Sequence, residues 1–249
     1  MEWYKDIDNA IFPTEDDKEK NIYRIIPFDT LLQMLTEHKN YLVKTSKWED
    51  SYENFFLKET FMHKGKPQSL DYYKERVFGQ CWTTRQSSDA LWRIYSPDKK
   101  SVRIKTTVGK LWHSTNESVN KGKCVIGQVQ YLSQSQIQKD LQNSRPLSLK
   151  KVADLMVSSF FVKRQSFSHE SEYRVIYLCD QDSKDKEKDV KECDIDPLSF
   201  IMNIYFDPRS DETYVNRCKK ILSDALGFPS NRIHKSTLYD FKPITIQIV

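Results

Sequence analysis

Charged side chains alternate at Glu170, Glu172 and Arg174, just ahead of a run of β-branched and aromatic residues. The pattern predicts a loop that leads into a strand. Side chains two residues apart in an extended segment point the same way, so these three would line one face at the mouth of the strand. Ile176 and Leu178 would continue that face into a packed core. The two carboxylates are candidates for catalysis, although a solvated edge or a structural ion pair gives the same pattern.

A second charged residue interrupts an apolar strand near the start of the chain. Residues 21–26 read Asn-Ile-Tyr-Arg-Ile-Ile, which predicts a short strand that Pro27 ends, with Arg24 inside it. An arginine in this position either covers apolar surface with its stem or points into a cleft and binds phosphate or carboxylate. The strand by itself leaves both interpretations open.

Composition excludes several classes of nucleotide-binding protein. The chain has 249 residues, of which 38% are hydrophobic, so it can bury a sizeable core. Only six glycines are present, and no G-x-G-x-x-G or Walker pattern occurs. A Rossmann dehydrogenase and a P-loop NTPase are therefore excluded. The net charge of +4 permits a nucleic-acid partner without requiring one.

The cysteines and histidines give no sign of a disulfide framework or a metal site. The five cysteines are scattered and form no C-x-x-C pair, and the five histidines form no H-E-x-x-H motif. We therefore expect reduced thiols and no bound metal. The N-terminus lacks an apolar signal core, and no apolar run is long enough to span a membrane. A cytoplasmic protein without a membrane partner is the expectation.

The order of the elements predicts an α+β domain. Residues 1–20 are polar and are interpreted as an N-terminal arm, and residues 21–249 as a single domain. The apolar patterns predict a mostly antiparallel, interrupted sheet with flanking helices. The expected strands are residues 21–26, 41–44, 78–84, 101–105, 124–131, 173–178, 200–206, 233–235 and 244–248.

With these pieces in order, the chain resembles the bacterial domain of unknown function 2971 family. The resemblance covers most of residues 22–240. Its motifs are Ile22-Tyr23-Arg24, Cys81-Trp82-Thr83, Leu91-Trp92-Arg93-Ile94-Tyr95, Glu170-Ser171-Glu172-Tyr173-Arg174 and the unit that ends at Leu238-Tyr239. The family name carries no activity, so the chemistry has to come from the residues.

The same motif order is similar to that of the arginine–serine–glutamate class of ADP-ribosyltransferases. Those proteins place an arginine on an early strand, then a Ser-Thr-Ser strand, then Glu-x-Glu on a loop that enters a late strand. Here the matching positions are Arg24, then Thr83 and Thr84, then Glu170 and Glu172. This chain departs from the pattern in the middle motif, where Thr-Thr-Arg replaces Ser-Thr-Ser, although threonine keeps the hydroxyl.

This resemblance implies an ADP-ribosyltransferase-like fold and an enzyme that uses NAD as its substrate. Cleavage of the nicotinamide–ribose bond passes through an oxocarbenium-like state, which a carboxylate beside the ribose stabilises. The resemblance implies that role for Glu172, and it implies that Glu170 orients the acceptor. Arg24 and Glu172 are then expected to meet across one cleft.

The resemblance also implies a set of NAD-binding residues. Arg24 would bind the dinucleotide phosphates or ribose. Thr83 would brace the glutamate, and Thr84 would lie beside it in the binding site. Tyr23 or Trp82 could stack on nicotinamide, although an ordinary core role suits Trp82 better.

The leading hypothesis is therefore an ADP-ribosyltransferase-like bacterial toxin or phage-defence effector that modifies a protein or nucleic-acid acceptor. One alternative is a nucleic-acid-binding or nuclease-type defence protein. It draws on the basic residues Lys99, Lys100, Arg103, Lys105, Lys121 and Lys123, with Arg103 and Lys105 forming a stripe on one strand face. The other is a non-enzymatic protein-recognition module, which predicts a shallow surface in place of the cleft.

Overall fold

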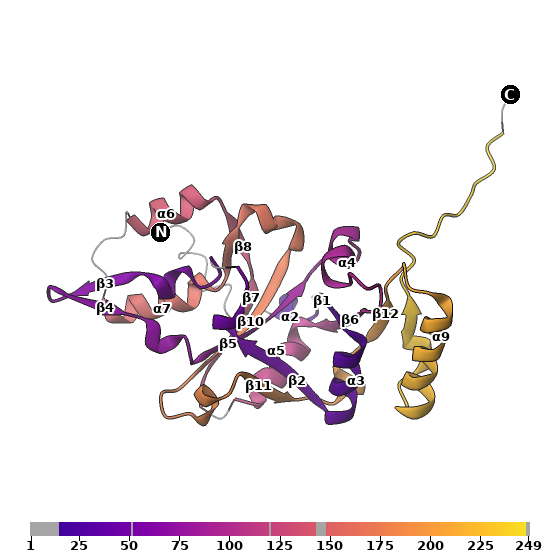
Figure 1. The fold of residues 1–249 in the computed structure, drawn as a ribbon, viewed down its shortest axis with the longest axis horizontal. Helices are drawn as coiled ribbons and strands as arrows, with labels where there is room; N and C mark the ends of the chain where they lie inside the picture. Colours follow the sequence, from indigo (N-terminus) through magenta and orange to yellow (C-terminus); the bar gives the residue numbers. More distant parts are fainter. Residues whose placement is uncertain (1–14, 51, 120, 143–147, 248–249) are drawn as a thin grey trace.

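A large mixed sheet forms the centre of the molecule (Figure 1). The computed structural model describes residues 15–50, 52–119, 121–142 and 148–247. In this part of the chain the sheet has nine strands in the order β11-β2-β5-β1-β6-β12-β13, with β10 paired to both β5 and β7. The strands are β1 (Asn21–Ile26), β2 (Lys39–Lys44), β5 (Val77–Thr83), β6 (Val102–Thr107), β7 (Gly122–Gln128), β10 (Glu172–Cys179), β11 (Val190–Asp194), β12 (Asn203–Phe206) and β13 (Ile233–Lys235).

Helices and two small strand pairs surround this sheet. The α-helices are α2 (Glu15–Lys18), α3 (Phe28–Glu37), α4 (Asp89–Tyr95), α5 (Val108–Glu117), α6 (Gln134–Gln142), α7 (Leu149–Ser159), α8 (Pro197–Phe200) and α9 (Glu212–Lys220). The small pairs are β3 (Thr60–His63) with β4 (Lys66–Ser69), and β8 (Gln130–Leu132) with β9 (Val162–Arg164). Short 3-10 helices include η2 (Thr45–Lys47), η3 (Phe55–Lys58) and η5 (Gln165–Glu170).

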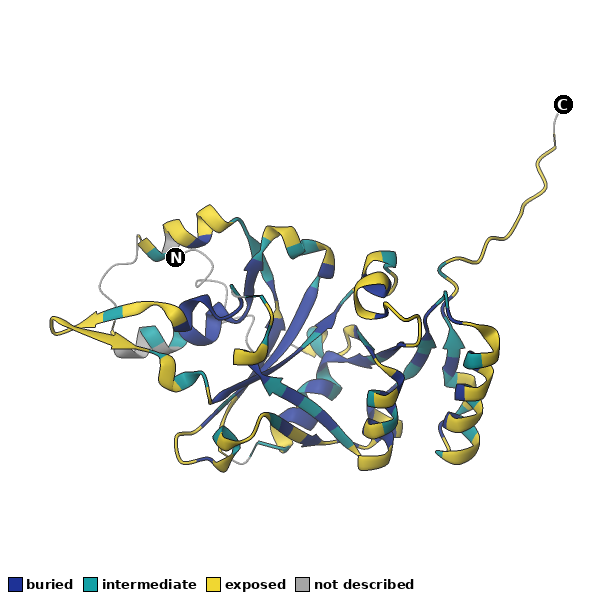
Figure 2. Ribbon diagram, viewed as in Figure 1, coloured by how far each residue is buried: buried dark blue, intermediate teal, exposed yellow. Residues whose placement is uncertain are grey.

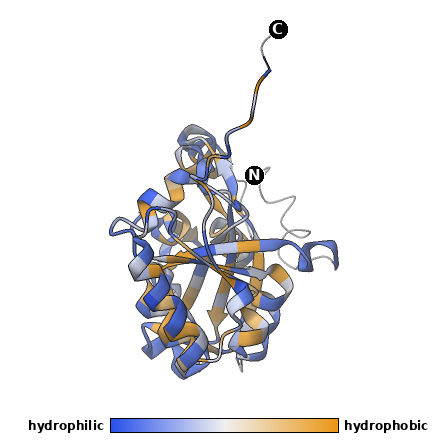
Figure 3. Ribbon diagram, turned by 90° about the vertical axis from the view of Figure 1, so that its right-hand side faces the viewer, coloured by the Kyte–Doolittle hydropathy of each residue, from blue (hydrophilic) through white to orange (hydrophobic). Residues whose placement is uncertain are grey.

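The α+β class and the mostly antiparallel sheet predicted from the sequence are confirmed. Among the described strands of the large sheet, only β12 and β13 pair in parallel. The central strands are mostly buried, whereas exposed residues concentrate on the helices, the β3–β4 hairpin and the C-terminal segment (Figure 2). Hydrophobic residues accordingly gather around the strands in the middle of the molecule (Figure 3).

Strand β10 is buried on both faces, and its alternation divides the core into two clusters. Tyr173, Val175 and Tyr177 pack in the larger cluster. Ile176 belongs to the smaller cluster, and Leu178 packs against it. The predicted continuation of the Glu172 face into a core is therefore confirmed, since successive strand side chains point to opposite faces.

The sheet opens between two neighbouring strands. β1 and β5 pair at a single register position, Tyr23 with Thr83. β5 then continues along β10 from Glu172 opposite Thr83 to Leu178 opposite Val77. Because β1 pairs along its whole length with β6 instead, it diverges from β5 beyond Tyr23 and leaves a gap in the ladder.

Two other expectations have different outcomes. Ile244 and Ile246 lie in an exposed segment without strand pairing, so the strand predicted over 244–248 is wrong for residues 244–247. Alternation alone produces no strand where no neighbouring strand offers hydrogen bonds.

The division into an arm and one domain stays a prediction, because residues 1–14 of the arm lie outside the described residues and residues 15–18 form α2.

Gly122 starts the strand that pairs with β10, and its backbone requires a glycine. It has φ +129, and a Cβ there would lie 2.3 Å from the Leu178 carbonyl oxygen. Gly65 also has positive φ, +74, but a Cβ there would meet no atom within 4 Å. We expect Gly122→Ala to lower the free energy of unfolding by about 1–3 kcal/mol more than Gly65→Ala does. Urea unfolding of both variants measures this difference, and equal losses would contradict the close approach.

Candidate active site

A cavity of about 290 Å³ lies where β1 and β5 diverge. Most of its lining residues come from β1 and β5, and α4 and the segment after η2 contribute Tyr95 and Trp48. The side chains around it are Tyr23, Arg24, Ile25, Val43, Trp48, Gly79, Gln80, Cys81, Trp82, Thr83, Leu91, Tyr95, Glu170 and Glu172. The cavity therefore combines aromatic walls with a few charged groups, which is typical of a small-molecule site.

Most of the residues singled out from the sequence line this one cavity. Arg24 and Tyr23 come from β1, Thr83 from β5, and the two glutamates from the segment that starts β10. Trp82 also lines it, although its ring is buried and its indole nitrogen donates to the Gln80 side chain at 2.7 Å. Thr84 is not among the lining residues, and its hydroxyl donates instead to the Ser171 carbonyl oxygen at 3.2 Å.

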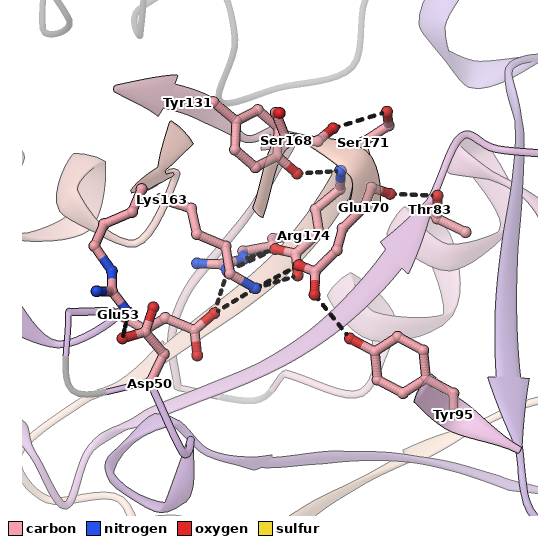
Figure 4. Close-up of polar contacts among 12 residues, drawn as sticks. Asp50, Glu53, Thr83, Tyr95, Tyr131, Lys163, Ser168, Glu170, Ser171 and Arg174 are labelled. Atoms are coloured by element: carbon pink, nitrogen blue, oxygen red, sulfur yellow. Dashed lines mark hydrogen bonds and ion pairs between the residues drawn. The ribbon is translucent and has the colours of Figure 1, made fainter. Parts of the chain in front are cut away.

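The alternating pattern predicted both glutamates on one extended segment, but the structure places them in two different elements. Glu170 ends the 3-10 helix η5, and β10 begins only at Glu172. Ser171 between them adopts a left-handed conformation with φ 45, an uncommon backbone state for a residue other than glycine. Both carboxylates nevertheless accept hydrogen bonds from the buried Lys163 ammonium, and Figure 4 labels Glu170 and Lys163.

Thr83 holds this turn through the backbone. Its hydroxyl donates to the Glu170 carbonyl oxygen at 2.5 Å and accepts from the Arg85 backbone N–H. The Arg85 side chain donates to the Ser171 hydroxyl at 3.0 Å. Thr83 therefore fixes the backbone of the turn that carries Glu170 and Glu172. It contacts the main chain of Glu170 and neither carboxylate.

Lys163 on β9 joins three buried carboxylates (Figure 4). Its ammonium nitrogen lies 2.5 Å from Glu170 Oε2, 3.0 Å from Glu172 Oε1 and 3.2 Å from Glu53 Oε1. Lys163 is 7% exposed, and the carboxylates are 5–7% exposed. Charges buried to this degree are stable only when they are paired and hydrogen-bonded.

Arg174 completes the network from the next inward position on β10. The fully buried guanidinium donates to Glu172 Oε2 at 2.6 Å, to the Phe160 carbonyl oxygen at 2.7 Å and to Glu53. It also lies 4.8 Å from the centre of the Trp48 ring. Glu172 therefore has one carboxylate oxygen on Lys163 and the other on Arg174, which fixes its orientation.

The network separates the pKa values of the two glutamates. Burial, together with the hydrogen bond between the two carboxyl groups, raises the pKa of Glu170 above its ordinary value, against the influence of Lys163. Burial would also raise the pKa of Glu172, but the charges of Arg174 and Lys163 outweigh it and lower that pKa. Glu172 therefore stays a carboxylate, while Glu170 holds a proton more readily.

Two tyrosine hydroxyls fix the positions of these groups. Tyr95 on α4 donates to Glu170 Oε1 at 3.1 Å, and burial raises the pKa of this tyrosine so that it stays protonated. The Tyr131 hydroxyl accepts the Glu172 backbone N–H at 2.8 Å. Both contacts reduce the freedom of the carboxylates at the cavity wall.

Arg24 differs from the other charged residues of the cavity. In the described ranges it makes no hydrogen bond or ion pair, and the ionisable groups nearest to it are Cys81 and Tyr95. Burial raises the pKa of the Cys81 thiol to about 12, so Cys81 does not balance the arginine. Burial also lowers the pKa of Arg24, but a guanidinium remains charged at neutral pH. A half-buried cation without a partner suits the binding of an anion.

Sequence reasoning missed Lys163 and Glu53. Glu53 is 121 residues from Arg174, its partner in the network, so no local spacing relates them. Lys163 follows the apolar run Phe160-Phe161-Val162, and a lysine there was a weak signal of a buried charge.

The residues that the structure describes contain no group of three or more His, Cys, Asp or Glu side chains suited to a metal ion. They also contain no helix that is both long and apolar enough to cross a membrane.

Comparisons with known proteins agree with the resemblance but assign no activity. The protein family of unknown function DUF2971 matches residues 91–175, which confirms the resemblance over that segment. No curated protein matches the chain.

Two solved structures of Thermus sp. 2.9 DarT are similar to the chain. The complex with ADP-ribosylated ssDNA has 13% identity and a TM-score of 0.39, covering 91% of this chain and 97% of that one. The complex with NAD+ has 14% identity and a TM-score of 0.39, covering 88% and 96%. Likeness at this level does not establish what the chain binds.

The charge network predicts a large cost for removing its central lysine. In Lys163→Met, three buried carboxylates lose their shared cation, so we expect the free energy of unfolding to fall by about 3–5 kcal/mol. The control is Lys121→Met, which breaks an exposed pair with Asp182 and should change the free energy of unfolding little. Urea unfolding measures both, and a similar small loss in the two variants would show that Lys163 does not hold the network together.

Proposed function

We propose that the chain is an ADP-ribosyltransferase-like enzyme that cleaves the nicotinamide–ribose bond of NAD and transfers ADP-ribose to a macromolecular acceptor. The observation that carries this proposal is the placement of Arg24, without a partner in the described residues, in the cavity that also receives Glu170 and Glu172. An anion-binding cation and a fixed carboxylate facing one cavity are what a charged dinucleotide requires at its reacting end.

The cavity suits the reacting end of NAD and leaves the rest of the dinucleotide outside. Its volume of about 290 Å³ is at the lower limit of small-molecule sites, about 300–1,000 Å³. Arg24 would bind the pyrophosphate or a ribose hydroxyl. The Tyr23 ring is almost fully buried and packs on the Arg103 guanidinium, so Tyr23 would form part of the cavity wall without stacking on nicotinamide. Thr83 and Thr84 hold the turn before β10 and would act by positioning the glutamates.

Glu172 would stabilise the transition state. As the bond between ribose C1′ and the nicotinamide nitrogen breaks, its electron pair leaves with nicotinamide, and the ribose gains oxocarbenium character. A carboxylate fixed by Lys163 and Arg174 needs little reorganisation to face that developing charge. Its lowered pKa keeps it ionised for this role.

Glu170 would act on the acceptor. An acceptor hydroxyl, amide or ring nitrogen forms the new bond to C1′ and gives up a proton, which Glu170 can take. Its raised pKa makes it the stronger base of the pair. The acceptor would be a protein or a nucleic acid, and such an activity in the cytoplasm suits a bacterial toxin or a phage-defence effector.

The geometry favours this proposal over a protein-recognition module. That alternative predicted a shallow surface at this place, whereas the structure has a cavity with buried charges beneath it. Arg24, which has no ion-pair partner in the described residues, would stay uncompensated beneath a docked protein and weaken the association.

Nicotinamide release and NAD affinity test the two principal roles separately. We expect Glu172→Gln to lower the rate of nicotinamide release by about 100-fold or more while NAD still binds, because only transition-state stabilisation is lost. We expect Arg24→Gln to weaken NAD binding by about tenfold or more. Chromatography of the products and equilibrium titration of NAD provide the two measurements.

The matched controls are exposed residues of the same types. Glu192→Gln lies on β11, and Arg93→Gln lies on the outer face of α4, so both should retain wild-type values. Circular dichroism and unfolding midpoints verify that Glu172→Gln remains folded. If the wild-type protein neither binds NAD nor releases nicotinamide with protein or nucleic-acid acceptors, the proposed function is wrong.

The pH dependence of the reaction identifies the base. If Glu170 must be deprotonated, the rate falls as pH drops through an apparent pKa above the ordinary glutamate value of about 4.3. In Glu170→Gln this limb should disappear and the rate should be low at every pH. Rates at saturating NAD across the acidic range measure it, and an unchanged limb in the variant would exclude Glu170 as the base.

A further inference from the structure

A second cavity, of about 430 Å³, lies on the other side of β1 from the candidate active site. It is formed by β6, β12, β13 and the segment after β5, at the end of the sheet that carries β12 and α9 in Figure 1. It shares no lining residue with the first cavity. Its lining residues are Gln86, Ser87, Arg103, Tyr205, His234, Lys235, Ser236, Thr237 and Leu238.

Arg103 is the distinctive residue of this cavity. It is 5% exposed, and its buried Nε has no hydrogen-bond partner. One terminal nitrogen donates to the Gln86 carbonyl oxygen, and no carboxylate of the described chain pairs with the guanidinium. The sequence placed Arg103 with Lys105 in a basic stripe on one strand face, but Arg103 is buried. Tyr205 lies opposite it on β12, and the rings of Tyr205, Tyr23 and Trp92 pack against its guanidinium.

Aromatic rings hold the Arg103 guanidinium in place without neutralising it. Its central carbon lies 4.5 Å from the Tyr205 ring centre, 5.1 Å from that of Tyr23 and 5.9 Å from that of Trp92. Ring faces stabilise a cation by less than burying an unpaired charge costs. The rings therefore orient a planar donor that still lacks an anionic partner.

The other lining groups also suit an anion. Lys235 and His234 are the further basic residues, and the residues that line the cavity include no Asp or Glu. Lys235 pairs with Glu212, whose side chain is 70% exposed, so a ligand in the cavity can compete for its ammonium. The hydroxyls of Ser87, Ser236 and Thr237 add donors, as phosphate oxygens require.

A pair of rings beside these groups suits a nucleobase. The Tyr205 and His234 rings lie 5.2 Å apart at an angle of 31°, and both residues are partly exposed at the cavity. The Asn203 amide lies 3.3 Å from His234 Nε2 and limits rotation of that ring. Aromatic side chains next to a cationic groove are the usual means of binding bases and phosphates together.

We propose that this second cavity is a nucleotide-phosphate site in which Arg103 binds the phosphate and the Tyr205–His234 pair contacts the base. The phosphate belongs either to a free mononucleotide or to a nucleic-acid strand, since both present the same group. The proposal does not depend on NAD cleavage in the first cavity.

Binding of nucleotides to the intact protein tests the proposal. The probes are adenosine monophosphate, adenosine, and a single-stranded oligonucleotide of about six nucleotides. We expect a phosphorylated probe to bind and adenosine to bind at least about tenfold more weakly, because the phosphate contacts are absent. Arg103→Gln should weaken binding of the phosphorylated probe by about tenfold or more. The rim variant Lys235→Gln should weaken that binding as well.

Matched variants separate the two cavities. Arg24→Gln should leave adenosine monophosphate binding unchanged, and Lys235→Gln should leave NAD binding unchanged. Tighter binding of the oligonucleotide with a steep salt dependence would identify a strand as the source of the phosphate, and equal or weaker binding would identify a free nucleotide. Lys235→Gln keeps the test valid if Arg103→Gln fails to fold.

Two results would overturn the proposal. One is the absence of binding by either phosphorylated probe, or binding that Lys235→Gln and Arg103→Gln leave unchanged. The other is a parallel loss of NAD binding in Lys235→Gln, which would make the cavity part of the first site.

Discussion

The arrangement of the candidate active site depends on one buried ion-pair network. Lys163 and Arg174 together compensate the carboxylates of Glu53, Glu170 and Glu172, all of which are buried. Removing water from charges is expensive, so such a cluster is stable only in a geometry that satisfies nearly every group. That demand fixes the carboxylates more firmly than packing of flexible side chains would.

The rest of the fold supplies the partners of this network from distant parts of the chain. β10 contributes Glu172 and Arg174, β9 contributes Lys163, and the segment before η3 contributes Glu53. The same sheet diverges between β1 and β5, which opens a cavity lined by Arg24 and by Glu170 and Glu172 of the network. The charged groups therefore differ in kind: those under the cavity are paired with one another, and Arg24 is left for a ligand.

Local sequence patterns predicted the strands of the fold, but they did not predict which residues far apart in sequence contact each other. The alternation from Tyr173 to Leu178 predicted a strand with one face entering the core, because the strand period is a local property. The structure adds that the opposite face is buried as well. The turn at Ser171 was not predicted, since a left-handed serine is stabilised by tertiary contacts from Thr83 and Arg85. Motif order brought Arg24 and Glu172 into one hypothesis, and their catalytic roles stay predictions.

The residues that sequence reasoning missed or misplaced all depend on contacts with distant parts of the chain. Glu53 gave no local signal and Lys163 only a weak one, because the network joins Glu53 to residues more than 100 positions away. Arg103 was grouped with Lys105 in a basic stripe, whereas the Tyr205 ring opposite it on β12 and the rings of Tyr23 and Trp92 bury it. Whether a polar residue on a strand is exposed or buried depends on the next strand, which sequence spacing does not report.

A crystal structure of the protein with NAD, or with an analogue that resists cleavage, tests the central claim most directly. The account predicts the pyrophosphate or a ribose hydroxyl within hydrogen-bond distance of Arg24, and ribose C1′ about 3–3.5 Å from a Glu172 oxygen. Lys163 and Arg174 should keep their contacts with Glu172. A dinucleotide bound elsewhere, or a cavity in which Arg24 turns away from the ligand, would contradict it.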